Sequence, residues 1–210
     1  MAVVVRRHHR AALWGLLDQV HRLRRRVVMD GVVEADEFDQ GACLNLVAVD
    51  TLGRVRAATR LTPTLDPNLS CDVLQARLGG GFPRAPHIVE VSCHCVDPDL
   101  DDAARREILL DIRASQLELG RKHGWTHKLE VSYDHDIQPW IRAGMQVDIL
   151  GRPFLFPGDS DLSFGWMLTL DIAKPNAGLD FLGAETGFLQ DPDEDPGLLQ
   201  RYGEQFLQEA

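Results

Sequence analysis

The order of apolar and polar residues along this 210-residue chain alternates between a helical and a strand-like period. Between residues 9 and 28, leucine and valine recur every three or four positions, which predicts an amphipathic helix. The later segments predict a hairpin with its turn at 50–53, a buried strand at 87–96, a long helix at 99–124, a strand at 127–134, a short helix at 137–144 and a last strand at 162–172. This alternation predicts an α/β (α+β) fold with a mixed central sheet flanked by helices.

The ends of the two later helices carry their own signals. The long helix begins with acidic residues and closes with Arg121, Lys122 and His123 before Gly124, which is the polarity that a helix dipole favours. Proline lacks a backbone donor, so we expect Pro139 in the first turn of the short helix.

The acidic residues near the end of the chain predict a separate tail. We place one domain at 1–182 and an acidic C-terminal extension at 183–210, with residues 191–196 as a linker and a short helix after it. The expected arrangement is a solvated tail that docks loosely on the domain or not at all.

Composition restricts the class of protein. A hydrophobic content of 44% and a charged content of 26% are those of an ordinary globular protein, and a net charge of −10 argues against a general nucleic-acid binder. No apolar run approaches the roughly 20 residues that span a bilayer. The start MAVVVRRHHR is too short for a signal peptide, so we expect a cytoplasmic protein with no membrane partner and four free thiols.

The segment VEVSCHCV, within the predicted strand 87–96, raises the question of a metal site. Strand alternation would place Cys93 and Cys95 on one face, with Ser92 and His94 on the other. Zinc needs three or four converging ligands, and the sequence offers no second spaced Cys/His pair; the terminal pair at residues 8 and 9 is expected to be exposed. We therefore expect no metal, and a structural, buried thiol at position 95.

Several motifs follow one another along the chain in this order: LRRRVV, EADEFD, RLTPTLDPNL, EVS just before VDPDL, then VSYD and IRAG. From about residue 5 to residue 172 this order resembles the acyl-homoserine-lactone synthases, which make bacterial quorum-sensing signals. The resemblance implies a GNAT-like three-layer sandwich. It also implies an acyltransferase in which the amine of S-adenosylmethionine (SAM) takes an acyl group from a carrier thioester, and lactone closure then expels methylthioadenosine.

The resemblance assigns roles residue by residue. Arg24, Asp36, Asp39 and Arg60 fall on the SAM side: the aspartates suit the ammonium and sulfonium groups, and an arginine suits the substrate carboxylate. Attack requires that the SAM ammonium lose a proton, so a carboxylate is needed.

Glu90, with Ser92, is the catalytic candidate, as general base or as the residue that orients one. Ser132 and Trp140 are the candidates for the acyl pocket. In the alternative interpretation, EADEFD is a solvated loop and Arg60 is an ion-pair partner with a purely structural role.

The sequence departs from the family pattern at several positions. Val28 and Leu74 stand where the family has aromatic residues, residues 29–33 hold no tryptophan, and Cys93 replaces an arginine three positions after the glutamate. Three interpretations stay open: a SAM enzyme with a rearranged pocket in which Arg26, Arg56 or Arg84 substitutes, an acyltransferase for another amine, or a non-catalytic relative that binds a ligand.

The acyl donor is expected to be either an acyl carrier protein or acyl-CoA, with SAM as a substrate and no cofactor. An acidic carrier protein would seek a basic patch, for which the candidates are Arg105, Arg106, Arg113, Arg121, Lys122 and Lys128. The net charge of −10 disfavours an acidic partner, so acyl-CoA is a serious alternative.

Overall fold

The computed structural model describes residues 2–27, 37–79, 81–142, 144–156, 159–170 and 189–207. The chain divides into two compact units. The first comprises Met1–Arg60, Cys93–Gln116 and Glu185–Ala210, and the second comprises Leu61–Ser92 and Leu117–Ala184. Strands β3 (Val55–Pro63) and β4 (Ile88–Val96) and helix α3 (Asp102–His123) contribute residues to both.

The strands of the first unit run in the order β3-β2-β1-β8. Strand β1 (Ala2–Arg6) pairs antiparallel with β2 (Leu44–Val49) and parallel with the two-residue β8 (Leu189–Gln190). The turn between β2 and β3 is closed by two backbone bonds, from the Asp50 amide to the Arg54 carbonyl and from the Gly53 amide to the Asp50 carbonyl, as the predicted hairpin requires. The sheet is therefore mixed.

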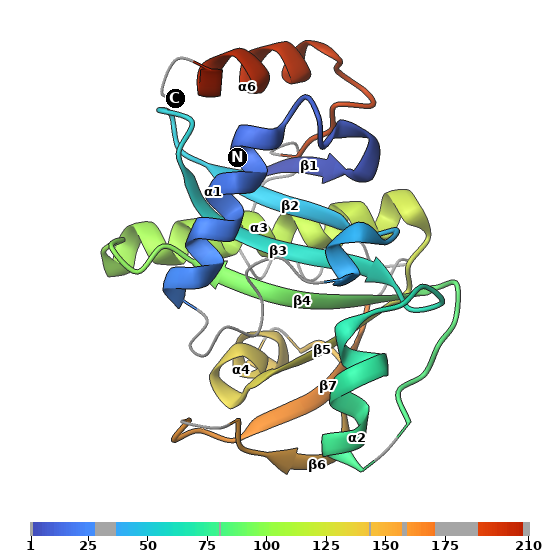
Figure 1. The fold of residues 1–210 in the computed structure, drawn as a ribbon. Coiled ribbons are helices and arrows are strands. Elements are labelled where there is room, and N and C mark those ends of the chain that lie inside the picture. The colour runs from blue at the N-terminus through green and yellow to red at the C-terminus, as the bar shows by residue number, and fades with distance from the viewer. Residues whose placement is uncertain are drawn as a thin grey trace. The chain divides into compact units, whose positions relative to one another are not determined.

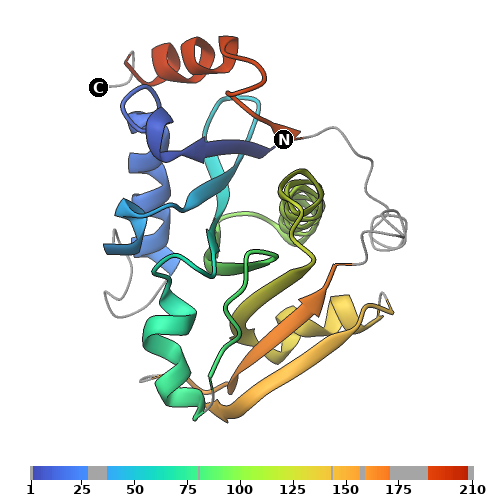
Figure 2. The same ribbon diagram turned by 90° about the vertical axis from the view of Figure 1, so that its right-hand side faces the viewer.

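Helix α1 (Trp14–Val27) packs its apolar stripe on one face of these strands (Figure 1). The cluster joins Leu13, Leu16, Leu17, Val20 and Leu23 to alternate valines of β1 and β2. The first part of α3 lies on the opposite side of β2 and β3, as both views show (Figure 2). This helix–sheet–helix arrangement agrees with the predicted three-layer fold.

The C-terminal segment is docked, contrary to the expectation of a loose tail. Helix α6 (Gly197–Leu207) inserts Leu198 and Tyr202 into the same cluster as α1, and both side chains are nearly fully buried. Before the helix, Arg6 donates two hydrogen bonds to Asp191, at 2.5 and 2.8 Å. The short helix itself was predicted; the domain boundary at 182/183 stays a prediction.

The strands of the second unit run in the order β4-β5-β7-β6. Strand β5 (His127–Tyr133) is parallel to β4 from Ile88 to Val91 and antiparallel to β7 (Ser163–Thr169), which pairs antiparallel with β6 (Val147–Phe154). Helix α4 (Asp134–Arg142) lies beside β5 and β6 (Figure 2), and the short helices η3 (Ser70–Leu74) and α2 (Gln75–Leu78) pack near β5 and β6 respectively.

Most predicted elements are confirmed, and the exceptions have local reasons. Pro139 lies inside α4, because the helix begins at Asp134 rather than near Ile137; the expectation of a first-turn proline was wrong. Strands β1 and β6 were not predicted. Cys93 has φ 52°, a left-handed conformation that is rare outside glycine, and it interrupts the alternation assumed for β4.

Within the described residues, no helix combines the length and apolar character that crossing a bilayer requires.

Candidate functional site

Two fully buried arginines converge on one carboxylate in the first unit. Arg24 of α1 donates to Asp39 Oδ2 at 2.9 Å, and Arg60 of β3 lies 3.4 Å from Asp39 Oδ1. Arg24 also donates to Asn45 Oδ1 at 2.8 Å. Asp39 comes from the 3₁₀ turn η2 (Glu37–Gln40), and its neighbour Phe38 places its ring 5.6 Å from the Arg60 guanidinium. We call Arg24, Asp39, Asn45 and Arg60 the arginine centre.

Burying the charged groups of the arginine centre costs free energy. Arg24 and Arg60 are 0% exposed and Asp39 is 4% exposed, so each charge has lost its hydration. Burial of this kind requires compensating partners. Arg24 Nε is a buried donor without a hydrogen-bond partner among the described residues. The structure thus brings together Arg24, Asp39 and Arg60, three of the residues predicted on the SAM side. The fourth, Asp36, lies outside the described residues. Asn45 was not predicted.

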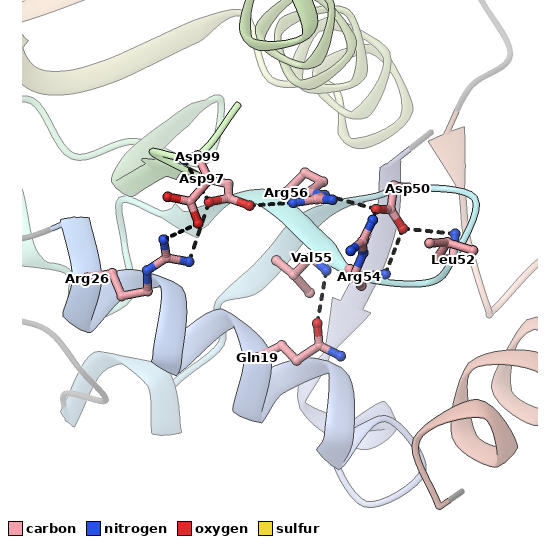
Figure 3. A network of polar contacts seen from close by, with 9 residues as sticks. All are labelled: Gln19, Arg26, Asp50, Leu52, Arg54, Val55, Arg56, Asp97 and Asp99. Carbon is pink, nitrogen blue, oxygen red and sulfur yellow. Dashed lines mark hydrogen bonds and ion pairs between the residues drawn. The ribbon is translucent and has the colours of Figure 1, made fainter. Parts of the chain in front are cut away.

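The substitute arginines considered from the sequence are engaged in ion pairs. Arg56 lies between Asp50 at 2.9 Å and Asp97 at 2.6 Å, while Arg26 contacts Asp97 and Asp99 at 3.4 and 2.7 Å (Figure 3). These arginines help to hold the pKa of Asp97 below its usual range against the effect of burial.

Arg84 of the second unit pairs with Asp72 and donates to the Thr64 carbonyl. Binding a substrate through Arg26, Arg56 or Arg84 would therefore disrupt an existing contact.

A buried carboxylate forms a second centre, in the second unit. Glu90 of β4 is 0% exposed. Its Oε1 accepts bonds from the Ser70 hydroxyl at 2.8 Å and the Ser70 amide at 3.2 Å, and its Oε2 accepts a bond from the Ser92 hydroxyl at 3.0 Å. We call Glu90, Ser70 and Ser92 the glutamate centre. The structure thus joins the two predicted catalytic candidates, Glu90 and Ser92, and adds Ser70, which sequence reasoning missed.

Of the predicted acyl-pocket residues, Trp140 contacts a buried lysine, and Ser132 contacts a second tryptophan at the same lysine. Lys128 Nζ lies 4.8 Å from the Trp140 ring centroid and 5.0 Å from that of Trp166, and it pairs with Glu130 at 2.8 Å. Trp166 Nε1 donates to Ser132 Oγ at 2.8 Å. Ser132 and Trp140 therefore both contact members of one buried group. Lys128, 4% exposed, cannot contribute to a surface basic patch, so that part of the expected carrier-protein surface was wrong.

His8, His9 and Asp193 form a group with metal-ligand character. Both Nε2 atoms lie against Asp193 Oδ1, at 2.7 and 2.9 Å, but Arg6 stands 3.0 Å from the other carboxylate oxygen and would repel a cation. The Arg6 amide also faces His9 Nδ1 at 3.4 Å, which favours the tautomer with its proton on Nε2.

We interpret the group as a hydrogen-bonded link between the two chain ends. His9, 3% exposed, was wrongly expected to be exposed.

The cysteines behave as structural thiols. All four are free, and Cys95 is buried with its thiol directed to the Ala58 carbonyl at 3.6 Å. Burial raises the pKa of Cys95 to about 12, which suppresses the reactive thiolate. The structural thiol predicted at this position is confirmed.

Comparison with solved structures defines the class of fold. The chain superimposes on a CoA-dependent acyl-homoserine lactone synthase, BjaI, solved with SAM and isopentyl-CoA (TM-score 0.76, 22% identity, 91% of this chain and 92% of that one). It also resembles the acyl-homoserine lactone synthase LasI (TM-score 0.69, 17% identity, 84% and 93%). The chain therefore has the GNAT-like fold of these proteins.

The sequence comparison identifies the family. A family model described as autoinducer synthase matches residues 14–157, more than half of the chain. A probable acyl-homoserine-lactone synthase of Sinorhizobium fredii (strain NBRC 101917 / NGR234) is 29% identical over 152 residues, covering 66% of this chain and 73% of that protein. The chain belongs to the autoinducer synthase family and is an acyltransferase.

Proposed function

We propose that the protein makes an acyl-homoserine lactone from SAM and an acyl thioester of coenzyme A or of an acyl carrier protein. The observation that carries the proposal is the arginine centre, where two buried guanidinium groups meet one carboxylate on residues that match the family motifs. Both the family and the chemistry of the glutamate centre fit this reaction.

The arginine centre suits the amino-acid end of SAM. The substrate carboxylate would accept hydrogen bonds from a buried guanidinium, and the Nε donor of Arg24, which has no partner within the part of the chain that the structure describes, suits such a contact. Asp39 supplies the negative charge that a sulfonium or ammonium group requires. In this assignment Arg24, Asp39 and Arg60 bind the substrate and take no proton.

The glutamate centre suits the proton transfer. Glu90, oriented by two serine hydroxyls, would accept a proton from the SAM ammonium directly or through a water molecule. The free amine then attacks the thioester carbonyl, the C–S bond breaks, the thiol leaves with the second proton of the amine, and Glu90 releases the first proton to solvent. Attack of the substrate carboxylate on the carbon next to sulfur closes the lactone and releases methylthioadenosine.

The acyl chain would lie near Ser132 and Trp140. Strands β4 and β5 pair from Ile88 to Val91 and separate beyond it, whereas Ser132 pairs with Phe164 of β7. A pantetheine arm could approach the unpaired edge of β5 at this point. Trp140 supplies one of the two tryptophan rings at Lys128, and Ser132 accepts a hydrogen bond from the other, Trp166, so both would contact the acyl group.

The test is mass spectrometry of reactions that contain the protein, SAM and a panel of acyl-CoA and acyl-carrier thioesters. We expect methylthioadenosine and acyl-homoserine lactone to appear together, and the preferred thioester identifies the donor. Glu90→Gln should lower turnover by about 100-fold or more, while Glu107→Gln, an exposed change on α3, should not.

Two results would contradict the proposal. Thioester cleavage without methylthioadenosine would indicate another amine acceptor, in keeping with the replacement of the family arginine by Cys93. Absence of turnover from folded protein with every donor would indicate a non-catalytic relative.

A further inference from the structure

Glu90 is held by two serines from different parts of the second unit. Ser92 lies two residues along the same strand, whereas Ser70 comes from the start of η3, twenty positions earlier. Ser70 contributes both its hydroxyl and its amide to one carboxylate oxygen, and it is 1% exposed. The two serines engage opposite oxygens of the carboxylate, so together they fix the orientation of its plane.

The position of Ser70 is itself fixed by Asn68. The Asn68 Oδ1 accepts the Cys71 amide at 2.9 Å, its side-chain amide donates to the Asp66 carbonyl at 2.9 Å, and its own backbone amide donates to Asp72 Oδ2 at 2.7 Å. These bonds set the start of a helical segment whose first five residues have the wide π geometry. Segments of this type occur frequently at functional sites.

We propose that Ser70 is a positioning residue for catalysis: it holds the Glu90 carboxylate in the orientation in which the carboxylate accepts the proton of the substrate amine. The inference rests on the proposed function, in which Glu90 is the base. A hydroxyl bonded to a charged acceptor contributes more than one bonded to a neutral acceptor. Ser70 acts through Glu90 and need not touch the substrate.

The test is Ser70→Ala, with kcat and KM measured for SAM and for the best thioester. We expect kcat to fall about 10- to 100-fold, the range for loss of one hydrogen bond to a charged group, with KM changed less than about 3-fold. Ser70→Thr keeps the hydroxyl and should recover most of the lost kcat. Ser163→Ala is the matched control, because Ser163 is equally buried and its hydroxyl has no hydrogen-bond partner among the described residues.

A double-mutant cycle separates positioning from a purely structural role. If Ser70 acts through Glu90, Ser70→Ala should change the residual kcat of Glu90→Gln less than about 2-fold. Equal losses in both backgrounds, or a loss that Ser70→Thr does not recover although the protein is folded, would overturn the inference. An active wild type with an unaffected Ser70→Ala would overturn this inference alone, whereas an inactive wild type would overturn the proposed function.

Discussion

Asp39→Asn tests whether the arginine centre is as buried as the structure describes. The substitution keeps the shape of the side chain and removes its charge. Arg24 Nη1 and Arg60 Nη1 lie 2.9 and 3.4 Å from its two oxygens, and all three side chains are at most 6% exposed. The variant would leave two dehydrated guanidinium groups without the anion on which both converge.

The expected loss follows from this burial. Removing one partner of a buried ion pair costs about 3–5 kcal/mol, because the remaining charge is left uncompensated. For a chain of this size, where 1 kcal/mol shifts the melting temperature by about 2–4 °C, the loss corresponds to about 6–20 °C. The loss should be present without substrate, because it arises within the protein.

Asp18→Asn is the matched control. Asp18 pairs with Arg22 at the same distance, 2.9 Å, but their side chains are 40% and 61% exposed. An exposed pair of this kind contributes about 0.2–1 kcal/mol. Thermal and urea unfolding followed by circular dichroism would measure both variants. If Asp39→Asn destabilises the protein by less than 1 kcal/mol, like the control, the reasoning from a buried charge cluster is refuted.

Three further predictions concern the surrounding structure. Tyr202→Ala should lower the free energy of unfolding by about 3–5 kcal/mol in urea titrations, because it empties part of the core under α6; a loss below 1 kcal/mol would mean that the helix is undocked. Cys95, with its pKa raised to about 12, should stay unmodified by iodoacetamide at pH 8 in folded protein and react after denaturation, as peptide mass spectrometry would show. Lys128→Met should shift tryptophan fluorescence and destabilise the protein by about 3–5 kcal/mol, and adding Glu130→Gln should recover most of that loss; an unchanged spectrum and stability would contradict the buried ion pair.

Periodicity predicted the elements whose exposed and buried faces differ. Helix α1, with its leucine stripe, is of this kind, whereas the β2–β3 hairpin, whose strands are mostly buried, was predicted with the help of its turn residues. Strand β1 has four consecutive buried residues and so shows no alternation, and β8 has only two residues. Strand β6 stands at the edge of the sheet with most side chains exposed, and Gly151 in it has φ 70° and no room for a Cβ beside Leu78. Because most side chains of this edge strand are exposed, its sequence does not show the alternation of apolar and polar residues that predicts a half-buried strand.

The candidate site was predicted from sequence motifs, so its residues outside these motifs were missed. Arg24, Asp39 and Arg60 were recognised through their order along the chain, whereas Asn45 and Ser70 carry no local signal. Lys128 was assigned to a basic patch on or near the long helix, whereas the structure buries it against Trp140 and Trp166 and pairs it with Glu130. Partners distant in sequence are determined by tertiary packing, which a single sequence does not display.

The link between the chain ends has a consequence for folding during synthesis. The bonds from Arg6 to Asp191 join residues 185 positions apart, and the core around α1 is completed by Leu198 and Tyr202. On the ribosome, β1, α1 and β2 emerge early, but their apolar face stays open until almost the whole chain has been translated. Such late, long-range closure is intrinsically slow and exposes nascent chains to aggregation. Released chains that are truncated before Leu189 should therefore be much less resistant to protease than the full-length chain.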